Sequence, residues 1–376
     1  MLCPNFVQKI EGGGVMKDKF MMDSHKMMWH LDRVNEWDKT GRTVPIHIDV
    51  GISKGCNIRC EYCYGATQGN LFQRQKDVTF PREALLRYFR TAGEAGVRSM
   101  AIIGEAEPTL NPYLYEAIKE GKKAGVDISL ATNGILFDDG KDGEEALENL
   151  TWIRFNISAY NDAGYRRVHA SKEFETFKKK VKFCVETKKR KNLDVTVGLQ
   201  MVLTPTNVDQ VIGLAKLGKE LGVDYLVVKQ CSDTRDNDIG VFENLSVYKT
   251  FDDVLKAAES ESTDDYKVII KWNKITNEGI RTYGRCLGVP FLLYSSGDGK
   301  LFPCGMFFDH RSDEFLMGNL LEQSFVEILQ SDRYWDVVKR VSELDVHKVC
   351  YANCRTNSIN EFVWNIKQVP NHVNFV

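Results

Sequence analysis

The stretch Gly55-Cys56-Asn57-Ile58-Arg59-Cys60-Glu61-Tyr62-Cys63-Tyr64 holds three cysteines in the spacing C-x3-C-x2-C. Structural zinc sites usually have four ligands in paired C-x2-C or Cys/His sets, and ferredoxin clusters take all their ligands from cysteine. A compact group of three is incomplete for both kinds of site. Three thiolates can, however, hold three irons of a four-iron cluster and leave the fourth iron open to a substrate or cofactor.

Strand and helix patterns alternate after this stretch. The apolar run 45–50 predicts a strand that leads directly into the cysteine loop. Six strands alternating with helices predict a parallel sheet, either an open doubly wound sheet or a barrel, with its chemistry at the carboxyl ends of the strands. The expected strands span 45–50, 98–103, 126–131, 152–158, 195–203 and 224–230, and the expected helices span 81–95, 112–124, 143–150, 172–190 and 207–221.

The pattern changes near residue 260. The runs 289–294 and 300–302 predict a hairpin around a glycine-rich turn, and an amphipathic helix is expected over 324–341. At the amino terminus the sequence offers a helix rich in methionine and tryptophan, roughly 24–37. We therefore expect an α/β chain in three parts: a helical extension at 1–44, a core at 45–260 and a small α+β domain at 261–376.

Composition narrows the possible partners and compartment. With 43% hydrophobic and 27% charged residues the chain is expected to fold, and a net charge of -2 offers no overall field for nucleic acid or an anionic membrane. No secretory signal is expected in residues 1–20 and no run of eighteen apolar residues occurs, so a cytoplasmic location is expected. In a reducing compartment, ten cysteines favour metal binding or catalysis over disulfides.

A second group of cysteines lies in the carboxyl-terminal part. Their spacing is too scattered for ligation by one local loop, yet they bring four soft ligands to one small domain. Zinc and an iron-sulfur cluster both fit that number. The four residues are Cys286, Cys304, Cys350 and Cys354.

The cysteine triplet, with Tyr62 before its last cysteine and a strand before its first, resembles the radical S-adenosylmethionine (SAM) superfamily. Later strand ends match as well: 104–112 is similar to the family's glycine-glycine-glutamate segment, with Ala106 replacing a glycine, and 131–134, 156–158 and 200–203 recur as strand ends. The resemblance implies a partial (β/α)6 TIM-like barrel. It also implies a [4Fe-4S] cluster with SAM at its open iron, held by Cys56, Cys60 and Cys63.

The resemblance further implies contacts to SAM. Ala106 and Glu107 would present backbone and carboxylate acceptors to the methionine ammonium. Ser158 and Asn133 would offer a hydroxyl and an amide group to the ribose or the methionine carboxylate. Val202 and Leu203, with the backbone around Tyr62, would flank the adenine. Taken singly, Glu107 also fits a solvated turn, and Asn133-Gly134 is a common turn pair.

The hairpin with its flanking cysteines resembles the auxiliary-cluster extension called SPASM, or its shorter twitch form. With four cysteines in the group, one auxiliary [4Fe-4S] cluster is implied in preference to zinc. Such a cluster would accept an electron from a substrate radical, and Asp233 is our candidate for the base that takes the proton. Cys231 would instead donate a hydrogen atom in a redox-neutral epimerisation, or it is a buried structural cysteine.

Three functions therefore compete. The first is a radical oxidoreductase of the dehydrogenase type, acting on a small molecule such as a sugar, aminocyclitol or related alcohol, with flavodoxin or ferredoxin as reductant. The second is a radical enzyme that modifies a peptide or protein, disfavoured because 44 residues before the core are few for a leader-binding domain. The third is an iron-sulfur electron carrier or zinc-binding module without enzymatic activity. No nucleic acid or membrane partner is expected.

Overall fold

The computed structural model describes residues 20–63, 78–233, 240, 242–351 and 353–375. Most of the amino-terminal segment in which we expect no secretory signal, residues 1–19, lies outside this range. No helix in the described residues is long and apolar enough to cross a membrane.

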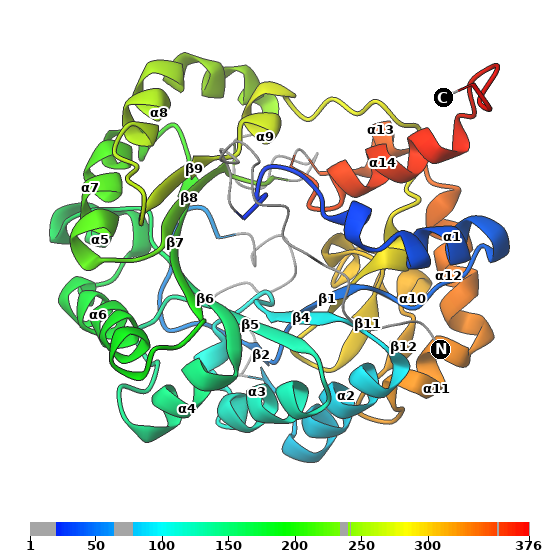
Figure 1. The fold of residues 1–376 in the computed structure, drawn as a ribbon, viewed down its shortest axis with the longest axis horizontal. Helices are drawn as coiled ribbons and strands as arrows, with labels where there is room; N and C mark the ends of the chain where they lie inside the picture. Colours follow the sequence, from blue (N-terminus) through cyan, green and yellow to red (C-terminus); the bar gives the residue numbers. More distant parts are fainter. Residues whose placement is uncertain (1–19, 64–77, 234–239, 241, 352, 376) are drawn as a thin grey trace.

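One sheet forms the centre of the described structure and curves into an open barrel (Figure 1). Its strand order is β12-β11-β10-β1-β4-β5-β6-β7-β8-β9, and neighbours from β10 to β9 pair in parallel. The strands are β1 His47–Val50, β4 Ser99–Ile102, β5 Asp127–Thr132, β6 Leu150–Asn156, β7 Thr196–Leu203, β8 Tyr225–Gln230, β9 Lys267–Ile270, β10 Leu292–Ser295, β11 Lys300–Phe302 and β12 Gly318–Asn319; β2 Ser53–Lys54 and β3 Val78–Thr79 form a separate pair.

Helices α2 to α8 cover the outer face of this barrel, and α13 and α14 lie at its open side (Figure 1). The helices of the described residues are α1 Leu31–Thr40, α2 Arg82–Ala95, α3 Leu114–Lys123, α4 Lys141–Asn149, α5 Asp162–His169, α6 Phe174–Lys191, α7 Val211–Leu221, α8 Asp252–Glu259, α9 Trp272–Thr276, α10 Ser312–Phe315, α11 Phe325–Gln330, α12 Asp332–Ser342, α13 Val346–Val349 and α14 Asn357–Lys367.

The two faces of the strands differ in polarity. In β7, Val197, Leu199, Met201 and Leu203 belong to the main apolar core, which also contains buried side chains of the helices. Because side chains alternate along a strand, Gly198, Gln200 and Val202 face the barrel interior. The neighbouring strands follow the same alternation, with Asp49 of β1, Arg154 of β6 and Lys229 of β8 on the inner face. A polar inner face indicates a chamber for ligands, since a barrel interior that serves only stability is filled with apolar side chains.

The six expected strands and the barrel are confirmed, but the parallel series is longer than expected. β9 pairs with β8 through Tyr225 and Lys267, and β10 pairs with β1 through His47 and Leu292. Chain beyond residue 260 therefore contributes to both edges of the sheet. The run Lys267–Ile270 has four residues, too few for periodicity to separate a strand from a helix.

Two expected helices are interrupted. The segment 324–341 forms α11 and α12, separated by Ser331, which has an extended backbone and accepts a hydrogen bond from the amide of Tyr334 as the cap of α12. The amino-terminal helix begins at Leu31, after a short 3-10 turn over Met27–Trp29. Its Trp37 packs with Phe291 and with Val363 of α14, so α1 and α14 lie together beside the barrel (Figure 1).

Candidate active site

The cysteine loop is fixed by the carboxyl end of α5. The amides of Arg59 and Glu61 donate hydrogen bonds to the carbonyls of His169, at 3.2 Å, and Val168, at 2.9 Å. These carbonyls belong to the last turn of the helix, where carbonyl groups lack partners within the helix. The backbone of the loop that carries Cys60 is thus held by a helix more than a hundred residues later in the sequence.

The imidazole of His169 contacts the loop directly. Its Nε2 accepts a hydrogen bond from the amide of Ser158 at 3.0 Å, and its Nδ1 lies 3.1 Å from the sulfur of Cys60. Burial lowers the pKa of His169 to about 3, so the ring is neutral. Since Nε2 is an acceptor, the proton is on Nδ1, and the ring donates a hydrogen bond to Cys60.

Glu107 joins the ends of β4 and β5. Its carboxylate accepts hydrogen bonds from the amide and hydroxyl of Thr109, at 3.1 and 2.7 Å, from the hydroxyl of Thr132 and from the amide of Asn133, at 2.8 Å. Burial raises the pKa of Glu107, and these donors partly offset that rise. Both carboxylate oxygens are engaged within the protein, so Glu107 shapes the strand ends in addition to any contact with SAM.

The predicted substitution at Ala106 causes no backbone strain. Ala106 is half-buried and does not have a positive φ, so an alanine is tolerated at this position. The nearby Gly104 has a φ of 26°, and a Cβ there would lie 2.6 Å from the Cα of Gly51. The close approach of the two strand ends therefore requires glycine at 104.

Asn133 connects the end of β5 to the cysteine loop. Its Nδ2 donates to Oδ1 of Asn57 at 2.7 Å and lies 3.8 Å from the sulfur of Cys56. Its Oδ1 accepts a hydrogen bond from the amide of Ile135 at 3.1 Å. Two strand ends predicted to bind SAM, those that carry Glu107 and Asn133, are therefore tied to the loop that carries the cysteines.

The remaining predicted SAM residues lie around Tyr62. Tyr62 forms a small apolar cluster with Val168 and Cys231, against which Cys60 and Val202 pack. The hydroxyl of Ser158 accepts a hydrogen bond from the amide of Val202 at 3.0 Å. The side chain of Leu203, by contrast, is fully buried in the main core outside the barrel, so only its backbone borders the inner face.

The three thiols of the loop influence one another. Burial, then the Glu107 carboxylate and the Cys63 thiol raise the pKa of Cys56 to about 12, and burial with Cys63 and Cys56 raises the pKa of Cys60. Soft sulfur donors that repel one another as thiolates suit a positively charged metal centre. No three Cys, His, Asp or Glu side chains in the described residues stand in a closed metal-binding geometry, so the ligand assignment stays a prediction.

The second cysteine group interacts in the same way. Burial, and then Cys354, raises the pKa of Cys286 to about 11. The pKa of Cys304 is raised by burial and then by Cys354, Cys350 and Cys286. Asn360 of α14 donates to the sulfur of Cys286 at 3.5 Å. The donor set fits an iron-sulfur cluster chemically, and the four cysteines come from β10, β11, α13 and α14 or the segments beside them.

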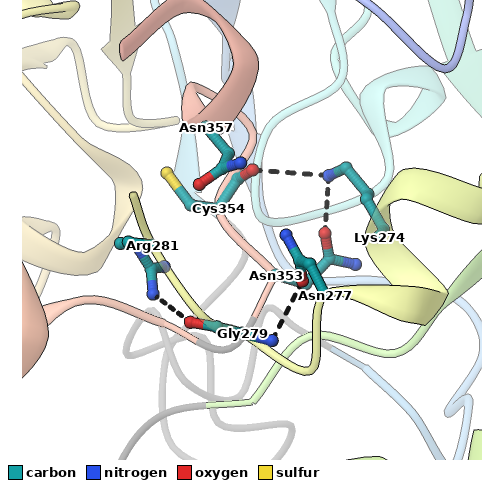
Figure 2. Close-up of a pocket in the computed structure, with 7 residues that line it drawn as sticks. All are labelled: Lys274, Asn277, Gly279, Arg281, Asn353, Cys354 and Asn357. Carbon is teal, nitrogen blue, oxygen red and sulfur yellow. Dashed lines mark hydrogen bonds between the residues drawn. The ribbon is translucent and has the colours of Figure 1, made fainter. Parts of the chain in front are cut away.

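A small pocket lies beside Cys354 (Figure 2). Lys274 of α9 donates from Nζ to Oδ1 of Asn353 at 2.5 Å and to the carbonyl of Cys354 at 3.5 Å. Arg281 donates to the carbonyl of Gly279 at 2.8 Å and to that of Tyr351. Burial disfavours the charge of Arg281, but Cys354 and Cys350 raise its pKa overall, so its cation lies near the predicted cluster ligands. The lining residues are Lys274, Asn277, Gly279, Arg281, Asn353, Cys354 and Asn357.

Residues 353–355 cross the open side of the barrel. Asn353 donates to the carbonyl of Gln230, at the end of β8, at 2.8 Å. The guanidinium of Arg355 is paired with the Asp49 carboxylate of β1, with Nε 2.6 Å from Oδ2. Cys354 thus lies between contacts to two widely separated strands of the core.

The two candidate catalytic residues follow β8. Cys231 is fully buried, with its sulfur 3.9 Å from the carbonyl of Tyr62, and Asp233 is also fully buried. Burial and then Asp233 raise the pKa of Cys231 to about 12, which keeps the sulfur protonated. Cys231 belongs to the Tyr62 cluster, and Asp233 lies close enough to Cys231 to raise its pKa. The catalytic roles of the two residues stay predictions.

His169 and Asn360 were missed by sequence reasoning although each contacts a predicted ligand sulfur. Both lie in helical patterns, where a single polar residue gives no signal of its own. The short segment 162–169 follows a strand end, 156–158, that matches the family, and this position in the chain is the one indication that could have directed attention to His169.

Two sequence profiles match this chain. Residues 50–218 match that of the radical SAM superfamily, and residues 292–356 match SPASM, an iron-sulfur cluster-binding domain. The second match favours iron-sulfur over zinc for the carboxyl-terminal cysteines.

Similar proteins include the tungsten-containing aldehyde ferredoxin oxidoreductase cofactor-modifying protein of Pyrococcus furiosus, 23% identical over 75% of this chain and 80% of that protein. The AdoMet-dependent heme synthase of Methanosarcina barkeri is 22% identical over 82% of this chain and 90% of its own length. The SAM-bound crystal structure of SuiB from Streptococcus suis has a TM-score of 0.61 at 15% identity and covers 83% of this chain and 72% of that chain. At this identity the structural likeness concerns the fold.

Proposed function

Because the chain belongs to the radical SAM superfamily and carries an iron-sulfur cluster-binding domain, we propose that it oxidises a small-molecule substrate through a substrate radical. When bound, SAM and the [4Fe-4S] cluster supply a 5'-deoxyadenosyl radical that removes a hydrogen atom, and the auxiliary cluster supplies an electron acceptor. The residues proposed to hold the first cluster are Cys56, Cys60 and Cys63. The expected substrate is a sugar, aminocyclitol or related alcohol, and the expected reductant is flavodoxin or ferredoxin.

The crossing segment 353–355 carries this proposal. Asn353 contacts the end of β8 and Arg355 contacts Asp49 of β1, so Cys354 is held at the open side of the polar chamber. A ligand of the auxiliary cluster at this place would put the electron acceptor next to the space in which a substrate radical forms. This arrangement favours oxidation over a redox-neutral reaction.

The amino-terminal segment favours a small substrate over a peptide. Phe20 and Met22 pack on Tyr225, Val227 and Ile269, and the rings of Phe20 and Tyr225 have centroids 5.2 Å apart. These three partners lie on the inner face of β8 and β9, so the chain itself occupies part of the chamber. The named activities of the two relatives, cofactor modification and heme synthesis, agree with a small-molecule substrate.

Asp233 is proposed as the base that accepts the proton from the substrate radical. It follows β8 two residues after Cys231, a member of the Tyr62 cluster, and its charge raises the pKa of that cysteine. Cys231 as a hydrogen-atom donor is the alternative, which would make the enzyme an epimerase. Incubation with cell extract in deuterated water separates these, because epimerisation adds solvent deuterium to carbon whereas oxidation removes two hydrogens.

SAM cleavage tests the enzyme itself. Anaerobically reconstituted protein reduced with dithionite is expected to convert SAM to 5'-deoxyadenosine and methionine, and Cys56→Ala is expected to abolish this. Cys184→Ala is the matched control, because Cys184 is buried in the main core and belongs to neither cysteine group. Absence of cleavage by the reduced wild type would refute the assignment.

The role of the auxiliary cluster needs a separate variant. Cys304→Ala is expected to retain SAM cleavage and to lose formation of the oxidised product. If product formation survives at the wild-type rate, oxidation does not depend on an electron acceptor in the second domain.

A further inference from the structure

The inner face of the barrel carries cations on β6, on β8 and directly after β9. Lys229 is in β8 beside Val202 of β7, and Lys271 follows the end of β9. The amide of Lys271 donates to the carbonyl of Val228 at 3.0 Å, which continues the pairing of β8 with β9 and puts the two lysines in adjacent positions. Arg154 of β6 faces the same interior, with its guanidinium over the ring of Trp152 at 4.8 Å.

These three cations are half-buried on the inner face and have no carboxylate partner in the part of the chain that the structure describes, although Arg154 also contacts the hydroxyl of Tyr225. Among the described residues, no carboxylate lies within ion-pair distance of Arg154, Lys229 or Lys271. The Nε of Arg154 is buried without a hydrogen-bond partner. The carboxylate of Asp49 is already engaged by Arg355 and His47, at 2.6 and 2.9 Å.

The cations also repel one another. Burial, then Arg154, Lys274 and Arg355, lower the pKa of Lys229 to about 7. Burial, and then the charges of Lys274, Arg355, Lys229 and Arg154, lower the pKa of Lys271. Lysine and arginine are rarely buried without a partner, because removing a charge from water is costly unless an opposite charge compensates. A group of such cations in a chamber is typical of a site whose missing charge is brought by a ligand.

Each of the three cations keeps part of its surface accessible to a ligand, since none is fully buried. The side chain of Arg355, on the open side of the barrel, keeps 42% of its surface accessible. Lys274, on the same side, is satisfied by the oxygens of Asn353 and Cys354, as Figure 2 shows, which leaves the other three cations for a ligand.

We propose that Lys229, Lys271 and Arg154 bind an anionic group of the substrate, a carboxylate or a phosphate, inside the barrel. The proposal rests on the proposed function in one respect, that the bound molecule is the substrate. The row of Lys229 and Val202 adjoins the Tyr62 cluster, so an anchored anion would orient the neighbouring carbon atoms toward the predicted SAM site. Among the proposed sugars and alcohols, those that carry a carboxylate or phosphate group would then be the preferred substrates.

Calorimetric titration of the reconstituted, SAM-bound full chain tests this. Inorganic phosphate and succinate are the two probes, with sodium chloride at matched ionic strength as the blank. The wild type is expected to bind at least one of them, and the probe bound more tightly identifies phosphate or carboxylate. The double variant Lys229→Met/Lys271→Met is expected to bind at least about tenfold more weakly, since two charge-assisted contacts are lost. The exposed Lys123→Met is the control and is expected to bind as the wild type does.

Folding of the double variant is checked by its thermal midpoint, which is expected to equal or exceed that of the wild type because repelling charges are removed. Phosphate or succinate should raise the midpoint of the wild type and leave that of the double variant unchanged. Equal binding by the wild type and a folded double variant, or no binding of either probe by the wild type, overturns the proposal. SAM cleavage is measured on the same samples: cleavage without anion binding refutes only this inference, and anion binding without cleavage refutes only the proposed function.

Discussion

His169 offers a crossed test of the candidate site, because its two ring nitrogens serve different partners. His169→Gln places an amide oxygen where Nε2 accepts from Ser158 and loses the donor to Cys60, which lies 3.1 Å from Nδ1. His169→Asn places an amide donor near the position of Nδ1 and loses the acceptor for Ser158. The two variants therefore separate the effect on the predicted cluster from the effect on the fold.

The expected magnitudes follow from the hydrogen bonds. A hydrogen bond to a charged acceptor contributes about 1.5–3 kcal/mol, and if roughly 1 kcal/mol of it is specific to the more negative, reduced cluster, its loss lowers the reduction potential by about 40 mV. His169→Gln is expected to show this decrease with little loss of stability. His169→Asn is expected to keep the potential and to lose about 1–3 kcal/mol of stability, because the buried amide of Ser158 is left without an acceptor.

Anaerobic redox titration followed by electron paramagnetic resonance measures the potential, and the change of signal on adding SAM identifies the cluster in the barrel. Thermal midpoints measured on the same samples report stability. Equal potentials in His169→Gln and the wild type would refute the assigned role of His169, and so would an equal decrease in both variants.

Three further outcomes are expected. Glu107→Gln should lower stability by about 2–4 kcal/mol, since a buried amide donor then faces the NH2 group of Gln, and an unchanged thermal midpoint would contradict the four hydrogen bonds. The pKa of Lys229 is about 7 in the folded chain, against an ordinary value of 10.5, so the unfolded chain binds more protons between pH 7 and pH 10.5. The thermal midpoint of the ligand-free protein should therefore rise with pH in this range, and it should rise less in Lys229→Met. Gly297→Ala should lower the free energy of unfolding by about 1–3 kcal/mol through overpacking, because its Cβ would lie 2.0 Å from the carbonyl oxygen of Ser53. In the control Gly284→Ala the nearest atom to the new Cβ is 3.7 Å away, so the thermal midpoint should change little.

The strand order of the core followed from local patterns. Each expected strand between 45 and 230 has a counterpart from β1 to β8, because runs such as Val195–Leu203 are long enough for hydrophobicity and flanking turns to agree. β9 has four residues and follows a polar segment, so the same criteria did not detect it. The break at Ser331 was missed because its cap depends on a backbone turn that leaves the apolar periodicity of the segment unchanged.

Side-chain direction was harder to predict. Val202 and Leu203 were both expected beside adenine, yet consecutive residues of a strand face opposite sides, and Leu203 belongs to the outer core. Glu107 was identified as a site residue, but its four donors come from two strand ends whose approach no local pattern records.

The sequence by itself predicted the cofactor chemistry of this protein, since the spacing of Cys56, Cys60 and Cys63 is a local property of one loop, and the ordered strand ends predict where SAM would bind. Only the tertiary structure decided which groups surround that chemistry. His169 reaches Cys60 across 109 positions of sequence, Arg355 reaches Asp49 across the open side of the barrel, and Lys229 and Lys271 become neighbours through strand pairing. These contacts join distant segments, and their energies depend on burial and on the charges brought together, neither of which is fixed until the barrel is formed.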